Sequence, residues 1–187
     1  MRIMIFIVFL STTLLQAGAQ SNLRFQSQNY IGLLEGDNGS AFQFLSINGI
    51  QKKTWFLGLG SGIDWYLYRS IPVFLSVNKD WKPSNRTFYL SLDGGANFAW
   101  ESRERNRFDN FISYDFTPGL YWGAGIGYKL RLKNNGDAIT LNLGYNYKRV
   151  KEERVSPTFC NNPPCPNLTE RYDYRLSRIS LRFGWLF

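Results

Sequence analysis

Large apolar residues recur at every second position over long stretches of the chain. In the last ten residues, Ile179, Leu181, Phe183, Trp185 and Phe187 alternate with positions that are mostly polar, charged or glycine. Successive side chains of a β-strand point to opposite faces, so this alternation predicts a strand with one apolar and one polar face. We therefore expect the chain to end in a long β-strand.

The same alternation predicts strands through most of the chain. The clear stretches are residues 55–67, 71–77, 88–98, 120–132, 139–148 and 178–187, and two weaker ones are residues 28–34 and 41–47. The inward and outward faces of the two weaker strands cannot be assigned from the pattern. The total is about eight strands, and several exceed the 9–11 residues that a tilted strand needs to cross a bilayer.

The face opposite the apolar residues consists mainly of Gly, Ser, Thr, Asn and charged residues, and glycines recur at every second position in 58–62 and 123–127. Such small polar residues make a poor hydrophobic core, but they suit a narrow lumen, where glycine relieves crowding. Closure also removes strand edges, as a membrane requires. The prediction is an all-β fold, a closed antiparallel transmembrane β-barrel of about eight strands. A secreted soluble ligand-binding barrel, with its apolar face inside, is the third-ranked interpretation.

The first nineteen residues have the layout of a secretory signal peptide. Arg2 is followed by an apolar run over residues 3–10 and by the small residues Ala17-Gly18-Ala19. A retained membrane anchor needs about 20 apolar residues, more than this run contains. We expect residues 1–19 to be removed as a signal peptide and residues 20–187 to form the barrel domain.

The C-terminal strand resembles a known targeting motif. A terminal aromatic residue, Phe187, preceded by alternating apolar residues from Ile179 onward, is similar to the C-terminal assembly signal of Gram-negative outer-membrane proteins. In length and strand number, the chain resembles the small OmpA/OmpX-like outer-membrane β-barrel domains. The resemblance implies a place in the cell outer membrane, contact with its lipid, and delivery by periplasmic chaperones and the barrel-assembly machinery.

Charged residues on the polar strand faces are the first candidates for a functional site. Asp93 and Arg182 lie six and five residues from the short-turn ends of their strands, and Asp64 and Arg178 both lie nine residues from theirs. We expect Asp93 to pair with Arg182 and Asp64 with Arg178 inside the lumen, while Lys129 and Arg131 lie lower down. Because an eight-strand barrel barely holds its own side chains, we interpret this network as a structural plug. A gated ion path is the alternative.

Two long connections, residues 101–115 and 150–173, are expected to be outer loops. They carry charges of both signs in a chain with a net charge of +8. A solvated mixed-charge surface is the simpler interpretation. Binding of lipopolysaccharide phosphates is the alternative that the basic residues favour.

The only two cysteines, Cys160 and Cys165, fall in the second of these connections. In an exported chain they are predicted to form a disulfide that closes a small proline-rich ring. A zinc site is disfavoured because the chain has no histidine, and a redox motif normally has two intervening residues rather than four. Mass spectrometry without reduction should show a deficit of about 2 Da.

The absence of histidine from the chain excludes histidine-based catalysis and histidine metal sites. We expect no enzyme activity, no cofactor and no nucleic-acid partner, and a monomeric protein. The predicted function is an integral outer-membrane β-barrel protein with a structural or cell-surface interaction role. A small ion- or solute-conducting pore is the alternative.

Overall fold

The computed structural model of the protein describes residues 23–83, 86–102, 113–132, 137–158 and 166–187. These ranges contain the strands β1 (Leu23–Gly36), β2 (Gly39–Lys52), β3 (Trp55–Asp64), β4 (Tyr68–Trp81), β5 (Thr87–Ser102), β6 (Ser113–Thr117), β7 (Gly119–Arg131), β8 (Ala138–Pro157) and β9 (Asn167–Leu186). Within the same ranges, no helix has the length and apolarity needed to cross a membrane.

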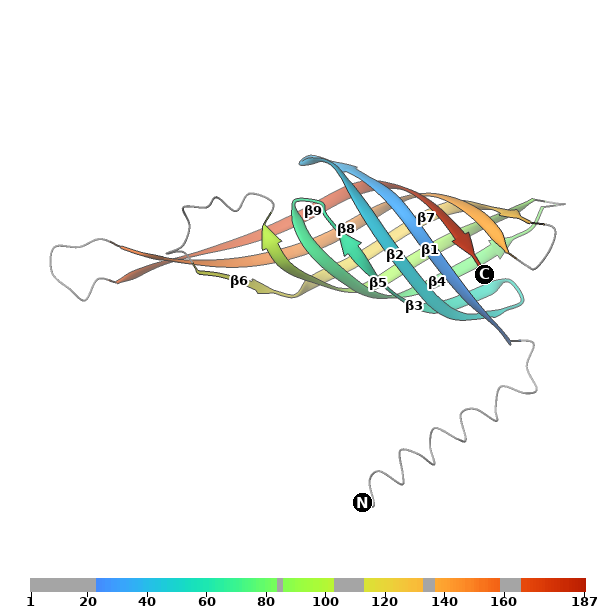
Figure 1. Ribbon diagram of the computed structural model, residues 1–187, viewed down its shortest axis with the longest axis horizontal. Helices are drawn as coiled ribbons and strands as arrows, with labels where there is room; N and C mark the ends of the chain where they lie inside the picture. Colours follow the sequence, from blue (N-terminus) through green and yellow to red (C-terminus); the bar gives the residue numbers. More distant parts are fainter. Residues whose placement is uncertain (1–22, 84–85, 103–112, 133–136, 159–165) are drawn as a thin grey trace, which may run out of the picture.

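The strands close into a single antiparallel barrel (Figure 1). Strands β1 to β4 each pair with the next strand in the chain, and the sheet continues from β5 to β7, β8 and β9. β1 closes the sheet on β9 from Gln28↔Leu186 to Gly36↔Arg178. β6 and β7 together occupy one place, because both pair with β8 and only Pro118, which lacks a backbone donor, separates them. The predicted closed antiparallel barrel of eight strand positions is therefore confirmed.

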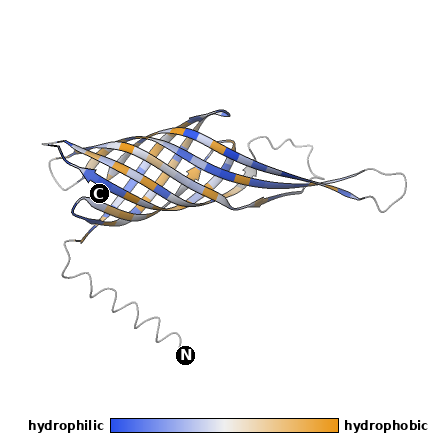
Figure 2. Cartoon of the chain, turned by 180° about the vertical axis from the view of Figure 1, so that it is seen from behind, coloured by the Kyte–Doolittle hydropathy of each residue, from blue (hydrophilic) through white to orange (hydrophobic). Residues whose placement is uncertain are grey.

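Apolar side chains cover the outside of the barrel. Leu143 is 60% exposed and Phe183 is 53% exposed, whereas Asn142 and Arg182, their neighbours in the chain, are 3% and 4% exposed on the lumen side. Figure 2 shows apolar residues spread over the body of the barrel. This facing is the one predicted, and it is the arrangement of a transmembrane β-barrel. A soluble ligand-binding barrel has the reverse arrangement, so that interpretation does not fit.

β1 and β2 carry apolar residues on both faces, which explains why the alternation did not assign them. Tyr30 and Leu45 are buried in the lumen, while the adjacent residues Ile31 and Phe44 are exposed outside. The first two strands therefore contribute part of the apolar filling of the lumen.

Glycines on the lumen face make room for large inward side chains, as predicted from their spacing. A Cβ atom at Gly127 would lie 2.3 Å from the ring of Tyr89 on the neighbouring strand. A Cβ atom at Gly60 would lie 2.5 Å from the ring of Phe74. The lumen is thus packed to the point where an added methyl group has no space at these positions.

β8 and β9 continue beyond the barrel as a two-stranded ribbon, at the end of the barrel opposite the C-terminus (Figure 1). They stay paired as far as Pro157↔Asn167, and β6 adds a short third strand on the β8 side. The expectation of an outer loop over residues 150–173 was therefore wrong for 150–157 and 167–173, which are strand. The same holds for β5 up to Ser102 and for β6 in the other long connection. We call β6, residues 149–157 of β8 and residues 167–177 of β9 the outer ribbon.

Candidate functional site in the barrel lumen

The most deeply buried charges form a cluster near the outer end of the lumen. Asp64, the last residue of β3, forms an ion pair with Arg178 on β9, and its other carboxylate oxygen lies 3.1 Å from the Lys148 ammonium on β8. All three side chains are wholly buried. Asp64 also accepts a hydrogen bond from the backbone N–H of Tyr66. One carboxylate thus holds two cations from two other strands.

A second level lies closer to the short-turn end. The Arg182 guanidinium donates to Asp93 at 3.0 Å and to the Asn146 amide oxygen at 2.7 Å. It also donates to the Tyr121 hydroxyl oxygen at 3.4 Å. The two pairs expected from the sequence, Asp64–Arg178 and Asp93–Arg182, are both present in the lumen.

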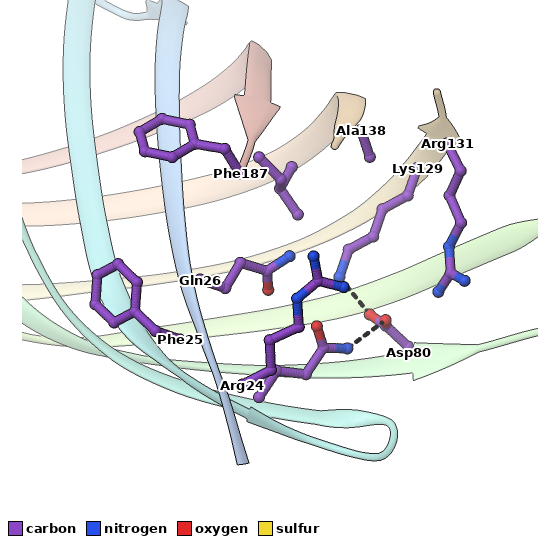
Figure 3. A pocket seen from close by; sticks show the side chains of 10 residues that line it. Arg24, Phe25, Gln26, Asp80, Lys129, Arg131, Ala138 and Phe187 are labelled. Atoms are coloured by element: carbon purple, nitrogen blue, oxygen red, sulfur yellow. Dashed lines mark hydrogen bonds and ion pairs between the residues drawn. The ribbon is translucent and has the colours of Figure 1, made fainter. Parts of the chain in front are cut away.

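A third level closes the short-turn end of the barrel. The Lys129 ammonium lies 2.6 Å from an Asp80 carboxylate oxygen, and Gln51 donates to the other oxygen at 3.2 Å. Figure 3 shows Lys129 and Asp80 pointing toward one another. They line a pocket of about 90 Å³ together with Gln51, Arg24 and Arg131. Arg131 is solvent-exposed, so it lies at the mouth and does not join the buried network.

Aromatic and aliphatic side chains fill the space between these levels. One buried cluster joins Tyr30, Leu45, Ile47, Phe56, Phe74 and Tyr121. A second, at the outer end, joins Leu34, Ala41, Tyr66, Tyr68, Val150 and Leu176. The ring of Tyr66 packs against Arg178, with 5.4 Å between the guanidinium carbon and the ring centroid. The charge levels and the two clusters together place buried side chains along the lumen from its short-turn end to its outer end.

Several buried polar atoms in the lumen have no hydrogen-bond partner among the described residues. They include both amide atoms of Gln43 and Asn97, Nε and Nη2 of Arg178, and the hydroxyls of Thr140 and Ser180. Buried polar groups that lack a protein partner are usually satisfied by ordered water. We therefore expect isolated waters between the levels.

Two members of this network escaped the sequence analysis. Lys148 continues the inward face of β8 after Asn142 and Asn146 at the end of the strand predicted over residues 139–148, but it was not counted among the lumen charges. Asp80 was missed because the apolar stripe of its strand ends at Val77. The polar positions Ser76 and Asn78 continue to Asp80 at the same spacing, and all three are buried in the lumen. Both residues can be found by following the polar positions of a strand at every second residue, beyond the point where its alternating apolar residues end.

The other candidate residues of the sequence lie outside this site. The alternate residues of the C-terminal strand, Ile179, Leu181, Phe183, Trp185 and Phe187, are all exposed on the outer surface. Phe187 is held by backbone hydrogen bonds of 2.8 and 3.1 Å with Ser27 of β1. Their role as an assembly signal stays a prediction. Cys160 and Cys165 lie outside the described residues, and so does the predicted signal peptide.

Charged side chains of the outer ribbon pair across its strands at its exposed surface. Arg149 makes two hydrogen bonds to the Asp173 carboxylate, at 2.6 and 2.8 Å, and Arg171 lies 3.3 Å from Glu153. Nearer the barrel, Tyr68 donates to the buried Glu152 at 2.7 Å. Arg149, Arg154 and Arg171 thus already have carboxylate partners in the chain.

Comparisons with known proteins leave the family open. No family model matches the chain, and no curated protein matches it. Among solved structures, the chain is similar to the solid-state NMR structure of outer membrane protein AlkL in DMPC lipid bilayers, at 12% sequence identity and a TM-score of 0.49. The alignment covers 91% of this chain and 92% of that one. The assignment of a transmembrane β-barrel therefore rests on the closed strand order and the apolar exterior of the chain itself.

Proposed function

We propose that this protein is a non-catalytic integral outer-membrane β-barrel, which holds an occluded lumen in the membrane and presents the outer ribbon at the cell surface for interaction. The observation that carries the proposal is the filling of the lumen by Asp64, Arg178 and Lys148 together with the two aromatic clusters. Each buried carboxylate of the lumen has a cationic partner, which is the arrangement of a structural network.

The exterior supports a place in a membrane, and the ribbon supports a role outside it. Exposed leucine and phenylalanine side chains surround the barrel, as hydrocarbon contact requires. The outer ribbon carries exposed charged and tyrosine side chains, such as Arg171, Tyr172 and Asp173, which suit water. Lipopolysaccharide phosphates are a candidate ligand, and at Arg149 or Arg171 the phosphate has to replace the present carboxylate partner.

Single-channel recording in planar bilayers tests the occluded lumen. We expect the purified protein to give no stable conductance that scales with salt concentration. Asp93→Ala, which frees Arg182 in the lumen, serves as the comparison after heat-modifiable gel mobility has shown that the variant is folded. A steady wild-type conductance that changes in Asp93→Ala would overturn the occluded barrel.

A small pore is the second candidate function, and one observation favours it. The unpartnered polar atoms of Gln43, Asn97 and Arg178 lie along the lumen and could be bridged by water. A pore formed in this way requires the Asp64–Arg178 pair to open. In the same recordings, brief openings that become longer in Asp64→Asn, with Lys148 and Arg178 unchanged, would support this function instead.

A further inference from the structure

One edge of the outer ribbon has no strand beside it in the part of the chain that the structure describes. β9 pairs with β8 along its whole length, but β1 leaves its other side after Arg178. Residues 167–177 therefore present an unpaired edge above the barrel rim. Unpaired edges readily accept another strand, and natural proteins usually cover or shorten them.

The register shows which backbone groups this edge offers. Phe187 exchanges both backbone hydrogen bonds with Ser27, so odd-numbered residues of β9 direct their N–H and C=O groups towards the β1 side. The pairing of β9 with β8 keeps one register from Leu186 to Asn167, so this parity holds into the ribbon. Thr169, Arg171, Asp173 and Arg175 therefore direct their backbone groups to the free edge.

The sequence of this edge is complementary to itself in the antiparallel direction. If Tyr172 of one copy lies opposite Tyr172 of another, Arg171 lies opposite Asp173 of the second copy, and Asp173 lies opposite its Arg171. Thr169 and Arg175 oppose each other in the same way. The opposed pairs are those whose backbone groups face outward, so the four pairs exchange about eight hydrogen bonds. Opposite charges stand directly across the new strand pair twice.

We propose that residues 169–175 of β9 bind the same segment of a second copy of this chain, forming one continuous sheet. This inference rests on the proposed surface role of the outer ribbon. The partner strand is a second copy of this chain because, with Tyr172 opposite Tyr172, Arg171 of each copy lies opposite Asp173 of the other. In each chain, Glu153 already contacts Arg171 and Arg149 already contacts Asp173. Pairing therefore extends a row of alternating charges across both ribbons.

The geometry of the pairing determines where the two copies stand. Antiparallel strands run in opposite directions, and the ribbon continues along the long axis of its barrel (Figure 1). The two barrels therefore lie at opposite ends of the joined sheet. Copies inserted with the same orientation in one membrane cannot make this contact, so this pairing forms no dimer within a single membrane. Copies in two facing membranes can make it.

Disulfide trapping tests the register. In a Cys160→Ser/Cys165→Ser background, Tyr172→Cys places two thiols across a pair whose Cα atoms lie about 4.5 Å apart, within disulfide reach. We expect mild oxidation to give a covalent dimer. Arg175→Cys is the matched control, because its counterpart in the second copy lies about 20 Å away along the strand. A mixture of Thr169→Cys and Arg175→Cys proteins should cross-link although neither does so alone.

Two further variants separate edge pairing from side-chain contact. Asp173→Pro removes an N–H that faces the free edge and leaves the bonds to β8 in place, whereas Asp173→Ala keeps that N–H. We expect the Tyr172→Cys dimer yield to fall at least tenfold with Asp173→Pro and less with Asp173→Ala. Equal loss in both variants would contradict pairing through the backbone, as would equal cross-linking at Tyr172→Cys and Arg175→Cys.

Vesicles test the facing-membrane arrangement. Proteoliposomes carrying the protein should cluster, and clustering should be lost with Asp173→Pro at equal protein content. A dimer that forms without vesicle clustering would overturn the facing-membrane arrangement, and cross-linking of Tyr172→Cys only to other proteins would overturn self-pairing. Bilayer conductance of the Asp173→Pro protein should equal that of the wild type. Failure of this inference is thereby distinguished from failure of the occluded lumen.

Discussion

Arg178 on β9 and Asp64 at the end of β3 lie 114 positions apart in the chain and form an ion pair that is wholly buried in the lumen. Lys148 contacts the other oxygen of the same carboxylate at 3.1 Å. Because the two cations share one anion, the network depends on Asp64 more than on either cation. The pair also ties the third strand of the barrel to its last strand.

Asp64→Asn should strongly destabilise the barrel. The substitution leaves the Arg178 and Lys148 charges buried without an anion, and removal of one partner from a buried ion pair costs about 3–5 kcal/mol. Urea unfolding in lipid vesicles, followed by tryptophan fluorescence, measures this loss. Asp173→Asn, at the exposed pair with Arg149, is the control and should cost far less, because water screens an exposed ion pair. Equal losses in the two variants would contradict the buried cluster.

Gly127→Ala should destabilise the barrel because the added methyl group meets the ring of Tyr89 at 2.3 Å. Overpacking of this kind costs about 1–3 kcal/mol. Gly94→Ala is the matched control on β5, where an added Cβ has no heavy atom within 4 Å. In a Tyr89→Ala background, Gly127→Ala should cost little, since the ring is gone. A cost that persists in that background would place the conflict elsewhere.

Leu143→Arg tests whether the apolar exterior contacts lipid. Leu143 is 60% exposed, and in water its replacement by arginine should change the free energy of unfolding by less than about 0.5 kcal/mol. Against hydrocarbon the same change costs about 2–4 kcal/mol at the middle of a bilayer. Ser113→Arg on the exposed outer ribbon is the control and should be neutral. Urea titration of vesicle-inserted protein decides between the two outcomes.

Alternation was sufficient to predict the barrel because most strands have one apolar and one small polar face. It was also sufficient to bring together Asp93 and Arg182, since counting from the strand ends fixes the height of each residue. It was insufficient for β1 and β2, where Tyr30 and Leu45 fill the lumen and both faces are apolar.

The outer ribbon could not be predicted from an apolar stripe because charges and backbone hydrogen bonds hold it together. Glu153 faces Arg171 across its strands, and Lys151 faces Asp173. Such a stretch resembles a solvated loop in sequence, and only the register of β8 against β9 shows it to be a strand pair. The same stretch concealed Lys148, which lies just inside the barrel where the charged run begins.

The Arg149–Asp173 pair should give the outer ribbon a measurable pH dependence. The side-chain hydrogen bond from Arg149 lowers the pKa of the Asp173 carboxyl below its usual value. The folded-state pKa therefore lies below the unfolded one, and the contribution of the pair is complete above the unfolded pKa and is lost as pH falls through the folded pKa. NMR titration of the Asp173 carboxyl carbon measures this shift. Arg149→Gln should return the pKa towards the usual value, and Lys151→Gln, which removes a weaker charge interaction, should raise it less. A pKa of Asp173 at or above the usual value in the unmodified protein would show that the pair does not form.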